Sequence, residues 1–107
     1  IFCSDEYLHA TNVEYLQHDT YTDVITFDYS EKKNVLNSDI FISIDRVREN
    51  SAKYNQTFLM ELYTVMIHGV LHLLGYKDST KEEATRMRAL EKKYTTRLAS
   101  SLPKATL

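Results

Sequence analysis

Cysteine is almost missing from this chain of 107 residues, in which Cys3 is the only one. A single cysteine excludes a disulfide within the chain and a zinc site built from cysteines, and it favours a reducing, cytoplasmic setting. Apolar runs are short as well, and none approaches the roughly 20 residues that a membrane-spanning helix needs. The start has no basic region before an apolar run, so we expect no signal peptide, and Ile1 in first place indicates a piece of a longer product.

An excess of one charge sign is also missing from the chain as a whole. The sequence has 13 Lys and Arg against 15 Asp and Glu, net −2, which argues against a strongly basic nucleic-acid binder. The charges are unevenly placed, however. Residues 1–76 contain 5 basic and 11 acidic side chains, net −6, whereas residues 77–107 contain 8 and 4, net +4. Two interpretations stay open: a surface on which a polyanion docks, or a solvated helix with paired charges.

The order of the predicted elements indicates an α+β fold. A strand ends at residue 3, and β-branched and aromatic runs predict strands at 23–29 and 39–44. Helices are predicted at 6–16, with Leu8, Val13 and Leu16 inward, at 46–54 after the cap Asp45, between Thr57 and Gly75, and from Ser79 or Thr80 to 98. The third helix is apolar nearly all round towards its end, so we expect it to be buried. We therefore predict one domain over 1–107, with a small mixed sheet flanked by helices and this apolar helix central.

Residues 68–80 read HGVLHLLGYKDST and contain two histidines four positions apart. On a helix, positions i and i+4 lie on the same face, so His68 and His72 project together. That spacing suits two imidazoles that bind one tetrahedral ion at about 2.0–2.1 Å. A pair of core histidines with satisfied hydrogen bonds is the alternative.

The residues that follow favour the metal site. His68, His72, Gly75 and Asp78 match the pattern H-x-x-x-H-x-x-G-x-x-ligand of metzincin-like sites. There the glycine ends the helix in a left-handed turn, and a third ligand folds back under the pair. Asp78 either completes this set or caps the next helix. Two histidines with one carboxylate suit zinc, which this spacing favours, and also iron(II).

Gly69 and Gly75 are the only glycines, and both lie inside this motif. Glycine costs about 1 kcal/mol in a helix interior, so Gly69 indicates a close approach of the backbone or another local use. In helical zinc peptidases the residue after the first histidine is a glutamate that acts as general base. Glycine cannot accept a proton, so a hydrolysis other than peptide cleavage is favoured.

These residues resemble a known family. HGVLHLLGY is very close to the signature HGxLHLxGYDH of the YbeY family of endoribonucleases, which act in ribosomal RNA maturation. Further blocks resemble the family in the same order over about residues 1–98: NVEY at 12–15, TDVITF at 22–27, SDIFIS at 38–43, and Met87 with Glu91 after the site. The resemblance implies a further strand and helix before Ile1.

The sequence departs from the family pattern at two places. Asp78 stands where the third ligand is normally histidine, and Lys77 replaces the usual aspartate before it. Leu16 occupies the position of an arginine that the family links to activity, and it cannot stabilise charge on a phosphate. Lys77 and His18 are the nearest substitutes in sequence.

The preferred hypothesis is a metal-dependent endoribonuclease that acts on ribosomal RNA precursors with the small ribosomal subunit as partner. His68, His72 and Asp78 are expected to hold zinc or another divalent ion. No side chain is assigned as catalytic, because the water that the ion makes acidic is the expected nucleophile. The resemblance implies that Thr22 and Asp23 bind the substrate; a role in the strand start and in local capping is the alternative for these two residues. Lys77 and Arg86 are the other expected substrate-binding residues. Further candidates for phosphate contacts are Lys81, Arg88, Lys92 and Lys93.

Two other functions stay open. One is a non-catalytic ribosome assembly or RNA-binding factor with a structural metal, which Leu16 in the arginine position favours. The other is a small metallopeptidase, which Gly69 disfavours.

Overall fold

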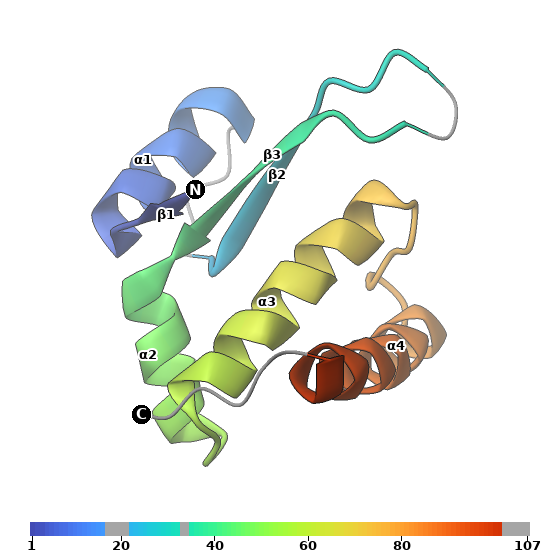
Figure 1. Ribbon diagram of the computed structural model, residues 1–107. Coiled ribbons are helices and arrows are strands. Elements are labelled where there is room, and N and C mark those ends of the chain that lie inside the picture. The colour runs from blue at the N-terminus through green and yellow to red at the C-terminus, as the bar shows by residue number, and fades with distance from the viewer. Residues whose placement is uncertain (17–21, 33–34, 102–107) are drawn as a thin grey trace.

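Three strands and four helices make up the computed structural model, which describes residues 1–16, 22–32 and 35–101 (Figure 1). The sheet has the order β1-β3-β2, with β1 parallel and β2 antiparallel to β3. This confirms the predicted α+β fold with a mixed sheet. The elements are β1 (Phe2–Cys3), α1 (Asp5–Leu16), β2 (Val24–Asp28), β3 (Ser38–Ser43), α2 (Ile44–Lys53), α3 (Phe58–Leu73) and α4 (Lys81–Ser101).

The two faces of the sheet are covered by different helices (Figure 1). Side chains alternate along β2 and β3, so one face presents Val24, Ile40 and Ile42 and the other Phe27 and Phe41. The first set packs with residues of α2 and α3 in the main hydrophobic core. On the other face, the Phe41 ring contacts Tyr7 of α1. Helix α3 therefore lies between the sheet and α4, in the central position that the sequence predicts.

The first turns of α1 and α2 are tied together at one edge of the sheet. Ser43 is fully buried, accepts a hydrogen bond from the Arg46 amide at 3.1 Å, and donates one to Asp5 Oδ1 at 3.1 Å. The Arg46 guanidinium lies 2.8 Å from Asp5 Oδ2. Ser43 is thus the N-cap of α2, and the predicted cap Asp45 is wrong. Asp45 instead accepts a hydrogen bond from the backbone of Asp5 at 2.9 Å, and Ile44 belongs to the helix.

The inward face of α1 differs from the prediction. Leu8 is fully buried, as expected, but Val13 is 43% exposed. Positions 8, 11 and 12 form the buried face, so the polar Thr11 and Asn12 point inward. The side chain of Leu16 lies outside the described residues.

Helix α3 is less completely buried than its apolar sequence predicts. Its buried positions include Val65, Gly69 and Leu71, whereas Val70 is 40% exposed and Leu74, just after the helix, 57% exposed. The reason is that the sheet, α2 and α4 pack against the helix and leave one side of it to solvent. Within the described part of the chain, no helix combines the length and the apolar character needed to cross a membrane.

Candidate metal centre and adjoining cleft

The end of α3 turns sharply at Gly75. This residue has φ +98°, which favours glycine because a Cβ would strain the backbone. The Gly75 amide donates to the His72 carbonyl and the Tyr76 amide to the Leu71 carbonyl, both at 3.0 Å. This pair of hydrogen bonds is a Schellman motif, which ends the helix and sends the chain back along it. The predicted left-handed turn is therefore confirmed.

The turn brings three potential ligands together. The Nε2 atoms of His68 and His72 are 2.8 Å apart, and each lies 3.6 Å from Oδ2 of Asp78. These three donor atoms all lie within 4.8 Å of one another. The predicted convergence of His68, His72 and Asp78 is thus present in the folded chain.

Hydrogen bonds fix the orientation of both imidazoles. His72 Nδ1 lies 3.1 Å from the Tyr76 carbonyl oxygen, and His68 Nδ1 lies 3.2 Å from Glu91 Oε2 on α4. A carbonyl and a carboxylate only accept, so each Nδ1 carries the proton and donates it. In the neutral rings each Nε2 then presents a lone pair, and two such atoms only 2.8 Å apart require a proton or a cation between them. The hydrogen bond to Glu91 also raises the pKa of His68, although burial of the ring acts in the opposite direction.

This donor set fits a divalent ion. Two facing lone pairs repel each other unless a proton or a metal ion lies between them, and the adjacent carboxylate favours the positive charge of either. Two ligand atoms on a tetrahedral zinc are about 3.3 Å apart, which lies between the 2.8 Å and 3.6 Å separations found here. A histidine whose other nitrogen donates to a carboxylate or carbonyl is the usual arrangement at metal centres.

The cluster is open to solvent on one side. The side chains of His68, His72 and Asp78 are 23%, 31% and 43% exposed. Asp78 does not cap α4: Thr80 accepts from the Glu83 amide at 3.1 Å, and Glu83 accepts from the Thr80 amide at 3.0 Å. The capping box therefore uses these two residues and leaves the Asp78 carboxylate directed at the histidines.

At Gly69, α3 lies close against the sheet. A Cβ at this position would lie 3.2 Å from Cγ2 of Ile40 and 3.4 Å from Cγ2 of Val24. The predicted close backbone approach is confirmed. The space beside Gly69 is filled by the strands, so a glutamate side chain could not be accommodated there without displacing them.

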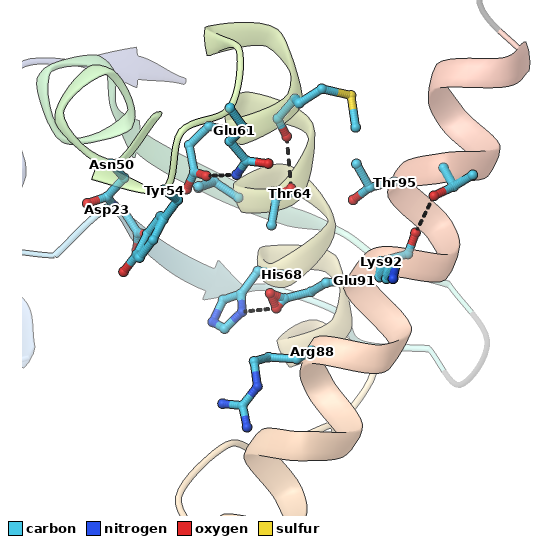
Figure 2. Close-up of a pocket in the computed structure, with 14 residues that line it drawn as sticks. Asp23, Asn50, Tyr54, Glu61, Thr64, His68, Arg88, Glu91, Lys92 and Thr95 are labelled. Atoms are coloured by element: carbon cyan, nitrogen blue, oxygen red, sulfur yellow. Dashed lines mark hydrogen bonds and ion pairs between the residues drawn. The ribbon is translucent and has the colours of Figure 1, made fainter. Parts of the chain in front are cut away.

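A cleft of about 640 Å³ adjoins the cluster and shares His68 with it (Figure 2). It lies between the end of α2, helix α3 and helix α4. Most residues that line it have polar side chains, including Asp23, Asn50, Tyr54, Gln56, Glu61, Arg88, Glu91, Lys92 and Thr95. Glu61 is 5% exposed, and its burial raises the pKa of its carboxyl group, with a hydrogen bond from Gln56 acting in the opposite direction.

The predicted substrate-binding residues are distributed differently. Asp23 lines the cleft, but Thr22 donates to the Val24 carbonyl at 3.4 Å, a local contact at the strand start. Lys77 is exposed beside Asp78, and the Arg86 guanidinium lies 5.3 Å from the centre of the Tyr76 ring. Neither Lys77 nor Arg86 lines the cleft.

Two further positions bear on the site predicted from the sequence. His18, named there as a possible substitute for the arginine, lies outside the described residues. Glu91 was noted in the sequence, but its contact with His68 was not foreseen. Glu91 follows Met87 by four positions, so both side chains lie on the same face of α4, and Met87 is 2% exposed. This spacing could have predicted that Glu91 faces inward.

Comparisons with known proteins identify relatives of the chain. The sequence profile of the family described as "Endoribonuclease YbeY" matches residues 1–99. A protein of that name from Amoebophilus asiaticus is 57% identical over 94 residues, which are 88% of this chain and 64% of the relative. One from Cytophaga hutchinsonii is 56% identical over 91 residues, 85% of this chain and 64% of the relative. The chain thus spans somewhat less than two thirds of these curated relatives.

A solved structure has a similar fold. The solution structure of TM1509 from Thermotoga maritima matches all of this chain and 75% of that one, with a TM-score of 0.58 and 27% sequence identity.

Proposed function

The chain belongs to the YbeY family, and from this premise we propose that it is a metal-dependent endoribonuclease that acts in ribosomal RNA processing. The proposed substrate is a ribosomal RNA precursor, the partner is the small ribosomal subunit, and the setting is cytoplasmic. The observation that carries the proposal is the convergence of His68, His72 and Asp78 at the turn after α3. We propose zinc as the ion, because two imidazoles and a carboxylate at this spacing suit it.

Each part of the site has a distinct task in this proposal. When bound, the ion would supply a Lewis acid for the scissile phosphate and lower the pKa of water. His68, His72 and Asp78 hold it, while Glu91 and the Tyr76 carbonyl keep both imidazoles in the tautomer that offers Nε2. Cations at the rim of the cleft attract the RNA backbone; these are Arg88 and Lys92.

Two features favour this function over the alternatives. Three protein ligands with one side open to solvent are typical of catalytic zinc, whereas structural zinc is enclosed by four. This argues against a purely structural ion in an assembly factor. The tight packing of Gly69 against Ile40 leaves no place for the general base of a helical zinc peptidase.

Cleavage assays on two substrates test the proposal. The protein, stripped of metal and then supplied with zinc, is incubated with a ribosomal RNA precursor fragment and with casein. We expect cleavage of the RNA only, and only with metal, while circular dichroism shows that the fold survives chelation. Unfolding by the chelator would instead support a structural ion, because binding and folding are then coupled. Casein cleavage would favour the peptidase.

Loss of the Glu91 carboxylate is expected to weaken metal binding without removing a ligand. Removing a group that orients a metal-binding histidine lowers metal affinity by about 10–100-fold, so we expect Glu91→Ala to lower zinc affinity by this factor. Glu91→Gln keeps an oxygen that accepts from His68 and should lose less. Zinc affinity is measured by competition with a coloured chelator. Glu82→Ala, on the exposed side of the same helix, is the control, and equal losses in both variants would contradict the positioning role.

A further inference from the structure

The cleft beside the metal centre is large enough for more than the ion and its water. Its volume of about 640 Å³ lies within the range of small-molecule sites, about 300–1,000 Å³. On the basis of the proposed function, we infer that it receives one unpaired base of the RNA next to the scissile phosphate. We infer further that Glu61 and Asp23 make it prefer bases with an exocyclic amino group, namely guanine, adenine and cytosine, over uracil.

The inner part of the cleft offers hydrogen-bond acceptors. Glu61 projects from α3, and Gln56 donates to only one of its carboxylate oxygens, Oε2. The carboxylates of Asp23 and Glu91 lie close enough to raise the pKa of Glu61 further. Glu91 accepts a hydrogen bond from His68, whereas Asp23 and the second carboxylate oxygen of Glu61 are acceptors that line the cleft. A ligand that brings N–H groups would be stabilised there.

Thr95 gives a second sign that the cleft is not complete without a ligand. This residue lines the cleft from α4 and is 4% exposed, and its hydroxyl has no hydrogen-bond partner within the described residues. Buried hydroxyl groups usually have a partner, since leaving one unpaired costs free energy. A polar edge that enters between α3 and α4 is one way to provide it.

The mouth of the cleft suits the other parts of a nucleotide. Tyr54 stands at its edge and is 59% exposed (Figure 2). Lys53 Nζ lies over its ring, 5.5 Å from the ring centre, so a base would stack on the opposite face of the ring. Arg88 and Lys92 project from α4 on the opposite side and can contact phosphates. Because His68 belongs to both the cleft and the metal centre, a base held here would place its own phosphate near the ion.

The chemistry of the four bases gives the direction of the preference. Guanine, adenine and cytosine each present an amino group that donates to a carboxylate, and guanine presents an adjacent N–H as well. Uracil has two carbonyl groups on either side of its single N–H. A carbonyl placed against Glu61 would leave the carboxylate without a donor, and such a mismatch reduces binding by about ten- to a hundredfold.

Cleavage of matched oligonucleotides tests this inference. The substrates differ only in the base on one side of the cleaved bond, and a second set varies the other side. We expect kcat/KM for uracil to be about ten- to a hundredfold lower than for the amino-bearing bases on one of the two sides. Glu61→Gln provides an N–H for a uracil carbonyl, so most of this discrimination should disappear. Glu82→Gln, exposed on α4, should keep it.

The outcomes separate this inference from the proposed function. Equal cleavage of all four bases by the parent, or unchanged discrimination in Glu61→Gln, would overturn the base preference while the nuclease function stands. No cleavage of any RNA with metal present would overturn the nuclease function. The cleft is then tested alone by titrating the four nucleoside monophosphates and following the backbone amide NMR signals of Tyr54 and Thr95. Shifts that are weakest for uridine monophosphate support the pocket, and no shifts for any of them refute it.

Folding should survive the variant. An amide at position 61 can still accept from Gln56, and it removes the cost of a buried charge. Thermal unfolding of Glu61→Gln verifies this. Asp23→Asn serves as a second variant, and a smaller loss of discrimination is expected because this side chain is more exposed.

Discussion

Replacement of His72 with alanine is expected to abolish metal-dependent RNA cleavage and to weaken zinc binding by more than about a hundredfold. Removing a group that only orients a metal ligand weakens metal binding by up to about a hundredfold. Removing the ligand atom itself should therefore weaken zinc binding by more than that. The free energy of unfolding of the metal-free protein should change little. The imidazole is 31% exposed, and its hydrogen bond to the Tyr76 carbonyl is worth about 1 kcal/mol.

The measurements are zinc content after dialysis, cleavage of the precursor fragment and urea unfolding. His9→Ala, on α1 and away from the cluster, is the matched control and should bind zinc as the parent does. Full cleavage by His72→Ala would show that the cluster is not the reaction centre. A collapse of stability in metal-free His72→Ala would show that the residue has mainly a structural role.

Glutamate at position 69 is expected to destabilise the fold severely, although it would complete the H-E-x-x-H pattern of a zinc peptidase. Its Cβ would already lie 3.2 Å from Ile40 Cγ2, and the rest of the side chain would carry a charge into the space between α3 and the sheet. Overpacking and an unpaired buried charge together cost about 3–5 kcal/mol or more, a large part of the stability of a small domain. No casein cleavage is expected to appear.

Urea unfolding checks this expectation, with Gly69→Ala as the control. Alanine gains about 1 kcal/mol of helix propensity, which roughly offsets its tight contact with Ile40. The alanine variant should therefore stay within about 1 kcal/mol of the parent. If Gly69→Glu were as stable as the parent, the proposed reason for glycine at this position would be wrong.

The metal centre could be predicted from the sequence because its geometry is local. The spacing of His68 and His72 fixes their common face, and Gly75 fixes the turn that returns Asp78. The i, i+4 spacing and the glycine turn each depend only on residues that are close together in the sequence. The α+β class was equally accessible, since short β-branched and aromatic runs distinguish β2 and β3 from the long apolar segment of α3.

Features that depend on packing between distant elements were not predictable in the same way. The choice of Ser43 over Asp45 as N-cap depends on Asp5, which reaches it only because β1 pairs with β3. The contact of Glu91 with His68 and the cleft beside it require the position of α4. The exposed side of α3 at Val70 likewise reflects which neighbours the helix has, and no pattern within its own sequence states that.

All three proposed ligands come from residues 68–78, one continuous stretch that starts in a helix and ends just after its terminal turn. Closing a loop costs conformational entropy that grows with the length of chain between its ends. Here that length is short, and the Schellman hydrogen bonds at Gly75 already restrict it. Little of the binding free energy would therefore be consumed in ordering the chain, and a ligand set of only three donors can hold its ion tightly.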